Sequence, residues 1–580
     1  MGQVLLESLT TKQLCLFGAT LFLFLTAFFV IGGTKGADPA SANVHIANLF
    51  HQKDVTAFGD DNRWEFYRVE KGPKGNPTAI EGSIFEEMQK NPLSASTNLI
   101  FSSKIPHPGA QMHPAYQFML VIMNIRVDYM QQGMGRAMNI DCDMEFNAKL
   151  AYSDVENPTE EKHWTFLQRV HNQSRPLICT FSGMQSREDG EEKTPEGKQK
   201  YQQWNHYTCQ DQHFFELGSV PHKHYLVNVH LPGDGQNKEC LAGGRHFLSG
   251  MDFVEIHQNG GYTISLFVSK TVMFPFIIGA LLFFVRRIKR ESRQWLLLER
   301  CILWLGSATS ILLLPIDWFT LVTDMPYMLF FSDLRQGFFY ACLLVFWCLF
   351  AGEHILDQEE RNQLSSYKYE IGSIVIGCVS LFLFDTVERG VQMKNPFHTI
   401  WKRDSGEKAA KAFIALAAIA SIIYCLFFMR LLYFVRKNIS MKSAALPAMQ
   451  TERRLFYENK IYRFRVLLYA TLSTVVITII CFIMDQVNET TWKFQDNSMN
   501  DYIIVSSAMH FGVFGMWGTY VFAVLILYSP DGKSNTSGNA VYYKRSEHLL
   551  SAGSTSDAQH EHDDEGEGDE IVSLPHPKKI

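Results

Sequence analysis

Ionisable side chains interrupt several apolar segments in the second half of this chain. They are Lys270, Asp317, Asp333, Arg335, Asp385, Lys411 and His510. A charge at the centre of a membrane helix costs at least ~2.5 to 3.5 kcal/mol on insertion scales, so the charges that remain usually face a partner, a cavity or water. Asp317 and Arg335 lie among aromatic residues, where an unpaired charge is expensive. The set predicts a polar, ligand-binding vestibule, whereas snorkelling or pairing at a helix end suffices to explain Lys270 and Lys411.

Catalytic motifs do not accompany these charges. The sequence contains no His-Glu-x-x-His zinc helix, no Gly-x-Ser-x-Gly elbow and no Gly-rich phosphate loop. We therefore expect no catalytic residues, no metal and no cofactor, and we do not expect an enzyme. A lone His510 in a bundle is more often a hydrogen-bonded core residue than a general base. An acyltransferase or hydrolase that uses His510 stays as an alternative.

Eight apolar windows provide the helices that would position these charges. A hydrocarbon core of ~30 Å needs about 20 apolar residues in a helix. The windows are 14–33, 266–285, 301–322, 328–351, 371–387, 409–435, 466–484 and 502–528. The first exceeds the ~7 to 15 residues of a signal-peptide core, which favours a retained anchor. The chain is predicted to be a multi-pass α-helical membrane protein, with one N-terminal anchor and a seven-helix bundle at 265–528.

Basic loops set the predicted orientation, because Lys and Arg in short loops mark the cytosolic side. The loop after the second span carries Arg286, Arg287, Lys289, Arg290, Arg293 and Arg300, and the loop after the sixth is equally basic. This places residues 1–13 and 529–580 in the cytosol and residues 34–264 in the lumen. One loop, 389–408, is also basic, although the number of spans before it places it in the lumen. The charges in the spans then all lie in the luminal half of the membrane.

Residues 34–264 have the pattern of strands. Apolar and polar residues alternate from Ile140 to Phe146, and short runs rich in β-branched and aromatic residues occur at 117–127, 138–152, 223–231 and 253–267. A luminal β-sandwich is predicted, without a fold for 34–100. Its four cysteines are Cys142, Cys179, Cys209 and Cys240. They allow three pairings, of which Cys179 with Cys209 is favoured because both lie in β-like runs that flank a polar loop.

Other segments carry candidate modification sites. Asn172 and Asn488 begin sequons on proposed luminal segments, so both are candidates for glycosylation. The tail 529–580 is rich in Ser and Gly and ends in an acidic run, which predicts disorder. A solvated tether is the simplest role for this tail, and a docking motif is the alternative.

Function classes can be narrowed further from motifs. The spans have neither the Asp-Arg-Tyr nor the Asn-Pro-x-x-Tyr motif of signalling receptors, and they lack the paired broken helices of secondary transporters. A receptor that binds something from the lumen remains. A seven-helix signalling receptor for a luminal or extracellular ligand stays as the alternative, and nothing indicates a nucleic-acid partner.

Several long strings in the sequence resemble a known family. They are Ile256-His-Gln-Asn-Gly-Gly-Tyr-Thr, Pro315-Ile-Asp-Trp-Phe, Phe330-Phe-Ser-Asp-Leu-Arg-Gln-Gly-Phe-Phe-Tyr-Ala, Phe384-Asp-Thr-Val-Glu-Arg-Gly-Val-Gln and Leu446-Pro-Ala-Met. In type and order they resemble the Wntless family, cargo receptors for lipid-modified Wnt proteins. The similarity extends over about 8–529 and is weakest at 36–100 and in the tail.

The resemblance implies a luminal sandwich of the GOLD type and a receptor-like seven-helix bundle that receives the acyl chain of a bound Wnt. Burying ~14 methylenes at ~0.8 kcal/mol each is worth ~11 kcal/mol. It also implies contacts with membrane lipids and traffic among endoplasmic reticulum, Golgi, plasma membrane and early endosomes, with retromer and clathrin adaptors as cytosolic partners.

Candidate ligand-binding residues follow from this resemblance together with the charge pattern. Those expected to shape the polar mouth are Asp317, Trp318, Asp333, Arg335, Asp385, Glu388 and Arg389. Those expected to border the acyl path or lie close to it are Phe331, Gln336, Tyr340, His510 and Trp517.

Two departures from the family pattern affect these expectations. Where the family has Tyr-Glu-Gly-Leu, this chain has Tyr457-Glu-Asn-Lys, which lacks the bulky apolar fourth residue of an endocytic signal. The pair Leu549 and Leu550, after Glu547-His, or the acidic tail could substitute for it. No cysteine lies between Cys15 and Cys142, so an expected early pair is absent and Cys142 and Cys240 are left over.

Overall fold

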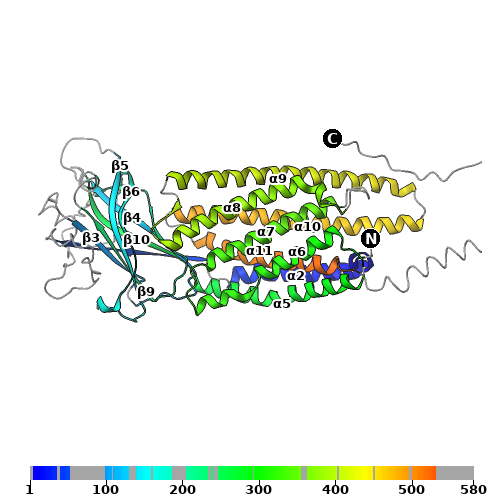
Figure 1. Ribbon diagram of the computed structural model, residues 1–580, viewed down its shortest axis with the longest axis horizontal. Helices are drawn as coiled ribbons and strands as arrows, with labels where there is room; N and C mark the ends of the chain where they lie inside the picture. The colour runs from blue at the N-terminus through cyan, green and yellow to red at the C-terminus, as the bar shows by residue number, and fades with distance from the viewer. Residues whose placement is uncertain are drawn as a thin grey trace, which may run out of the picture.

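The computed structural model shows a β domain at one end of a long helical bundle (Figure 1). It describes residues 4–35, 39–52, 98–107, 109–129, 139–158, 161–185, 204–232, 237, 240, 246–291, 293–353, 362–400, 404–448, 451–494 and 500–530. Side chains at 481–510 lie outside this description.

Ten strands form the β domain. They are β1 (Ala40–Ile46), β2 (Asn48–Gln52), β3 (Asn98–Ile105), β4 (Met119–Tyr129), β5 (Ile140–Ser153), β6 (Thr165–Gln185), β7 (Trp204–Cys209), β8 (Gln212–Leu217), β9 (His224–Leu231) and β10 (His246–Gln258). Their order is β1-β10-β4-β7-β6-β5-β9-β3-β2, and β8 also pairs with β4. The described ladders are all antiparallel.

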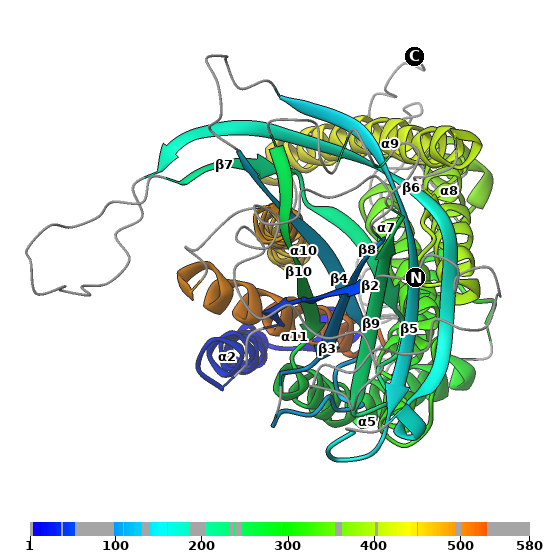
Figure 2. The same ribbon diagram turned by 90° about the vertical axis from the view of Figure 1, so that its left-hand side faces the viewer.

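The sheet folds back on itself because β1 and β2 are two halves of one bent strand. β1 pairs with β10 and β2 pairs with β3, while Ala47 between them donates its N–H to Met251 O (3.0 Å). Alternate residues of the strands, such as Met119, Val121 and Met123 of β4, then meet in one apolar core. This gives the sandwich-like domain that the alternating pattern predicted (Figure 2).

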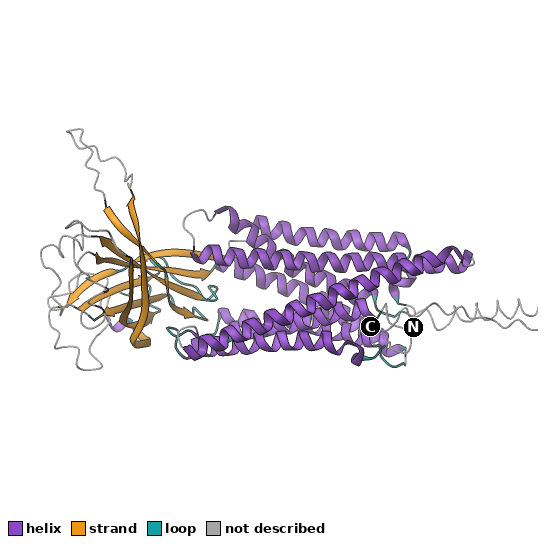
Figure 3. Cartoon of the chain, turned by 90° about the horizontal axis from the view of Figure 1, so that it is seen from above, coloured by secondary structure: helices purple, strands orange, loops and turns teal. Residues whose placement is uncertain are grey.

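Nine α-helices build the rest of the described chain. They are α1 (Leu5–Ser8), α2 (Thr11–Lys35), α5 (Gly260–Arg290), α6 (Leu297–Leu312), α7 (Met328–Gly352), α8 (Lys368–Lys394), α9 (Asp404–Ala445), α10 (Thr451–Phe494) and α11 (Asn500–Leu527). Short 3₁₀ segments are η2 (Glu161–His163), η3 (Pro315–Leu321), η4 (Leu364–Tyr367) and η6 (Leu446–Ala448). Figure 3 shows the helices running side by side, away from the sheet.

The helices confirm a multi-pass membrane protein. Among the described residues seven helical stretches are long and apolar enough to cross a membrane. The eighth predicted span, 502–528, corresponds to α11, whose described apolar part is Phe511–Leu527. The N-terminal anchor α2 packs against α11, where a Cβ at Gly512 or Gly515 would overlap Phe29 or Phe28. Small residues let two membrane helices approach closely.

Two sequence expectations were wrong in detail. The strand predicted at 253–267 ends at Gln258, because the Asn259 side chain accepts the N–H of Gly261 and caps α5. The helix therefore starts inside the segment 34–264 that the sequence assigned to the β domain. The span predicted at 301–322 stops being α-helical at Leu312, and Pro315 then opens η3.

The bundle end away from the sheet is held together by the start of the chain. Leu5 donates its N–H to Ser529 O (2.8 Å), and Arg463 Nη1 donates to Leu6 O (3.0 Å). Arg287 Nη1 donates to Pro530 O (2.8 Å). The Leu6 side chain is buried in the bundle core. Residue 4 and residue 530 thus meet at one end of the molecule.

Candidate functional site

A triad of buried charges ties three helical elements together near the β domain. Lys270 Nζ donates to Asp317 Oδ2 (2.9 Å), and Arg335 Nη2 donates to Asp317 Oδ1 (2.5 Å). The three residues are only 6, 5 and 3% exposed. Arg335 Nη1 also reaches Leu314 O (3.3 Å). One carboxylate thus pairs with two cations, so the triad carries one more positive than negative group.

The break between α6 and α7 places Asp317 in this triad. Pro315 has no N–H and fixes its own φ, so the α-helix cannot continue through it. The 3₁₀ turn η3 then directs Asp317 inward, and Thr320 Oγ1 donates to Asp317 O (2.6 Å) and contacts Gln117 Oε1 of the β domain (3.1 Å). Arg335 lies about two turns into α7. Lys270 comes from α5, about ten residues after its start.

Trp318 lies beside the triad and packs on α5. Its Nε1 donates to Thr271 Oγ1 (2.9 Å), and its ring meets that of Phe267 edge-on at 5.6 Å. Thr271 follows Lys270 directly, so the two contacts hold η3 against one turn of α5. Trp318 therefore acts with Asp317 in fixing the position of η3.

A second charge cluster joins the bundle to the β domain. Arg389 of α8 donates to Glu216 of β8 (2.8 Å) and lies 3.6 Å from Asp333 of α7. Gln392 donates to the other Glu216 oxygen (2.9 Å). Burial alone would raise the pKa of Glu216, but His213 and Arg389 beside it hold that pKa below its ordinary value. Glu216 is therefore ionised at neutral pH and pairs with Arg389 across the junction.

The rest of the predicted mouth follows α8. Asp385 lies one turn before Arg389 on the same face of the helix, and Glu388 directly precedes Arg389 in the chain. Asp385 is within electrostatic range of Arg389, which also attracts Glu388. Asp333, Asp385, Glu388 and Arg389 thus gather at the end of α7 and α8 that meets the β domain. The structure brings these four together, while Asp317, Trp318 and Arg335 form a separate, buried group.

The connection after α8 enters the β domain. Phe397 is 1% exposed and packs against Phe214 and Phe215 of β8, with ring centroids 5.3 and 5.6 Å away. Arg175 Nη2 donates to Phe397 O (3.5 Å), and burial lowers the pKa of Arg175 to about 10. One apolar side chain from the bundle is thus part of the β-domain core.

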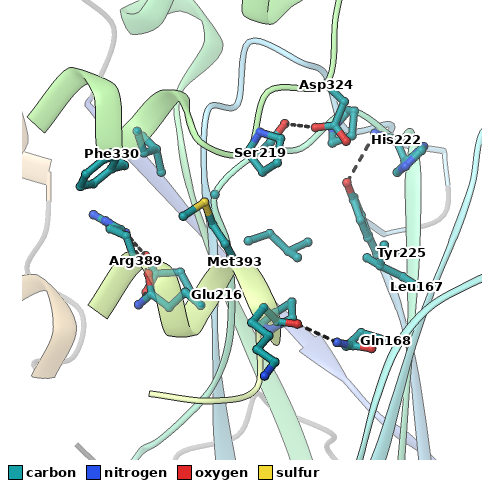
Figure 4. Close-up of a pocket in the computed structure, with 18 residues that line it drawn as sticks. Leu167, Gln168, Glu216, Ser219, His222, Tyr225, Asp324, Phe330, Arg389 and Met393 are labelled. Carbon is teal, nitrogen blue, oxygen red and sulfur yellow. Dashed lines mark hydrogen bonds and ion pairs between the residues drawn. The ribbon is translucent and has the colours of Figure 1, made fainter. Parts of the chain in front are cut away.

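A cavity of about 230 Å³ lies at this junction (Figure 4). Its β-domain wall includes Gln168, Glu216, Leu217, Ser219, His222 and Tyr225. Its bundle wall includes Asp324, Leu329, Phe330, Arg389, Gln392 and Met393. Ser219 Oγ donates to Asp324 Oδ1 (2.8 Å), and Gln168 Nε2 donates to Lys394 O (3.1 Å). The walls therefore combine charged groups with apolar ones.

The aromatic residues expected along an acyl path divide into two environments. Tyr340 and Trp517 meet edge-on at 5.2 Å, and Trp517 Nε1 donates to Thr478 Oγ1 (3.2 Å). Gln336 Nε2 donates to the Tyr340 hydroxyl (3.3 Å). Together with Thr478 of α10, Gln336, Tyr340 and Trp517 connect α7, α10 and α11. Phe331, in contrast, is 45% exposed on α7.

Three important residues were missed or misjudged from the sequence. Lys270 was explained as a residue that snorkels or pairs at a helix end, but it pairs with Asp317 buried inside the bundle. The sequence places Lys270 and Asp317 at similar distances from the same membrane face, and this match could have indicated the pair. Glu216 and Gln392 were not identified at all, because a carboxylate in a strand pattern and an amide near a helix end carry no local mark. Lys411 pairs with Glu407 on the exposed side of α9.

The four cysteines of the β domain form two disulfides. Cys179 is joined to Cys209 across β6 and β7, the pairing favoured from the sequence, and Cys142 is joined to Cys240. Asn172 is exposed and has a positive φ of 48° within the bend of β6. The side chains of Tyr457, Asn488 and His510 lie outside the described residues, as do Leu549 and Leu550.

Comparisons with known proteins match nearly the whole chain. A family model described as "Wntless, GOLD domain" matches residues 56–258, and one described as "Wntless-like, transmembrane domain" matches residues 259–532. The chain is 37% identical to Protein wntless homolog of Rattus norvegicus over 536 residues, 92% of each chain. It is 36% identical to the Homo sapiens protein of that name over 537 residues, again 92% of each. Protein wntless of Drosophila ananassae is 34% identical over 540 residues, 92% of this chain and 90% of the relative.

Proposed function

The chain belongs to the Wntless family, and from this membership we propose that it is a cargo receptor for lipid-modified Wnt proteins in the secretory pathway. Its task would be to bind the acylated protein, shelter the acyl chain from water and deliver the cargo to the cell surface.

The observation that supports this proposal best is the position of the charges. The triad around Asp317 and the cluster around Arg389 both lie where the bundle meets the β domain. Farther from the β domain the helices are apolar. A cargo with a polar protein part and an apolar chain needs this order of surfaces, and burying ~14 methylenes would supply ~11 kcal/mol.

The residues then take different proposed roles. Asp333, Asp385, Glu388 and Arg389 would contact the protein part of the cargo, because they are partly exposed at the junction. Asp317, Arg335 and Trp318 would keep η3 and α7 in place. Phe331 would border the acyl chain on the exposed side of α7, and Gln336, Tyr340 and Trp517 would border it inside the bundle.

The orientation and route are part of the same proposal. The β domain would face the lumen and the joined ends of the chain would face the cytosol, as the basic loops predict. The receptor would travel from the endoplasmic reticulum through the Golgi to the plasma membrane and return through early endosomes. Retromer and clathrin adaptors would act on the cytosolic loop or tail. Tyr457-Glu-Asn-Lys is a poor adaptor signal, so Leu549 and Leu550 would take over.

The test is co-purification of the full-length protein with cargo from secretory membranes. Acylated Wnt should be recovered well and an acylation-deficient Wnt poorly. Equal recovery of both would remove the lipid from the mechanism. Loss of the protein should block secretion from producing cells, whereas a block of the response in receiving cells would favour a signalling receptor.

A matched pair of variants tests the acyl path. Phe331→Ala should reduce recovery of acylated Wnt, because Phe331 would lie against the acyl chain. Phe434→Ala is the control, since Phe434 is similarly exposed, at 39% against 45%, but lies near the other end of the bundle on α9. Equal recovery with the two variants would contradict the role given to Phe331.

A further inference from the structure

We propose that the junction cavity binds the headgroup of a zwitterionic membrane phospholipid. The cavity measures about 230 Å³. This is below the ~300 to 1,000 Å³ of pockets that enclose drug-sized ligands. A small, charged headgroup fits such a volume better than a whole ligand does. The proposal requires only that the helices span a membrane, and it is independent of the cargo.

The polar groups of the cavity are separated into two poles. Figure 4 shows Arg389 and Glu216 on one side, Asp324 and Ser219 on another, and Met393 between them. In the described contacts Arg389 uses Nη1 toward Glu216 and Gln392, and Nε toward Asp333. Its remaining Nη2 can donate to a phosphate oxygen, the group that guanidinium matches best.

The opposite pole suits the ammonium group. Asp324 accepts a hydrogen bond from Ser219 through Oδ1, and among the described residues no contact is made by Oδ2, which can face a cation. Tyr225 also lines the cavity on this side, whereas Phe330 lies beside Arg389 (Figure 4). An anionic lipid such as phosphatidylglycerol would bring no ammonium group to Asp324, so a zwitterion is favoured over an anionic lipid.

Apolar surface continues from the cavity along the helices. Phe330 lines the cavity and packs on Phe382 of α8, with ring centroids 6.2 Å apart. Phe382 and Leu383 are each 40% exposed. A polar pocket above an apolar helix surface has the layout of a phospholipid, with its acyl chains below its headgroup.

The cavity also lies at the depth where headgroups are found. α7 starts at Met328 and α8 ends at Lys394, and residues next to both ends line the cavity. Ends of membrane spans lie in the interfacial region. A lipid bound there would bridge the β domain to α7 and α8 and would stabilise their junction.

The experiment is native mass spectrometry of the full-length protein in detergent, titrated with three dioleoyl lipids. Phosphatidylethanolamine or phosphatidylcholine should bind first, at least about tenfold more tightly than phosphatidylglycerol. Leu329→Trp, which fills the cavity, should weaken this first binding about tenfold. Leu364→Trp is the control, because Leu364 is exposed at the far end of the bundle. Asp324→Asn should shift the preference toward phosphatidylglycerol.

Several outcomes would overturn the proposal. One is phosphatidylglycerol binding as tightly as the zwitterionic lipids, and another is unchanged first binding in Leu329→Trp. Glycerophosphocholine binding as tightly as the intact lipid would show that a soluble molecule, not the membrane, supplies the headgroup. If Leu329→Trp lost the cargo polypeptide but kept the lipid, the cavity would be a cargo site. Thermal melting of each variant identifies any that fail to fold.

Discussion

Asp317→Asn is the substitution that tests the buried triad most directly. The change keeps the shape of the side chain but removes the carboxylate that faces both Lys270 and Arg335. Two cations would remain inside the bundle without the anion that holds them. We expect the helical bundle to lose stability, because an uncompensated buried charge cannot be solvated there.

The expected magnitude follows from burial. The three side chains are at most 7% exposed, so solvent screens their contacts little. Removing one partner of a buried pair costs about 3 to 5 kcal/mol. For a bundle of this size, that lowers the melting temperature by roughly 10 °C. Lys270→Met should cost less than about 1 kcal/mol, because it leaves a balanced pair of Asp317 and Arg335.

The assay is thermal melting of the full-length protein in detergent, followed by intrinsic tryptophan fluorescence and by size-exclusion profiles. Asp252→Asn is the matched control. It removes the same charge from an Asp252–Arg126 pair at 3.0 Å, in which the Arg126 side chain is 51% exposed, so it should cost about 1 kcal/mol or less. The reasoning is refuted if Asp317→Asn melts no lower than this control, or if Lys270→Met is the more damaging of the two triad changes.

Three further predictions concern the β domain and its junction. Burial alone would raise the pKa of Glu255, but hydrogen bonds from His257 and His45 hold it below the ordinary 4.5, so its contribution to stability should be present above about pH 4.5 and lost as pH falls further. Melting of Glu255→Gln should depend less on pH in that acid range, and an unchanged pH profile would contradict this. Phe397→Ala should destabilise the β domain by about 3 to 5 kcal/mol and speed its digestion by protease, and wild-type protease resistance would count against the anchoring role. Replacing both Cys142 and Cys240 by Ala should cost about 4.7 kcal/mol and replacing Cys179 and Cys209 about 3.7 kcal/mol, because the first bond closes a loop of 98 residues and the second a loop of 30. The reverse order of melting temperatures would contradict that estimate.

The architecture could be predicted largely from periodicity and length. Alternation at Ile140, Met144 and Phe146 identified β5, whose inward side chains are buried. The apolar windows identified the helices. The error at 253–267 has a local cause. β-like alternation and an apolar helical run follow each other without a gap, and Asn259 with its two following glycines is the only signal of the change.

The pairing of charges could be predicted less well. The sequence placed Asp317, Arg335 and Arg389 at one end of the bundle, and the structure shows them there. Which groups neutralise them depends on tertiary packing between segments far apart in the chain, as with Glu216 and Arg389. The burial of Phe397 in the β-domain core has the same origin. No spacing within either segment encodes it.

Because β1 and β2 form one bent strand, the time at which the sheet can close depends on the order of synthesis. β1 follows the first membrane helix directly, yet its partner β10 is the last strand of the domain. The ribosome therefore delivers β1 long before it can pair with β10, and closing the sheet is a contact of high sequence separation, which folds slowly. Until then β1 presents an open edge beside the membrane, with Val44 and Ile46 on a face that stays exposed in the finished fold. The interval before closure is when this domain is most exposed to mispairing with other chains in the same compartment.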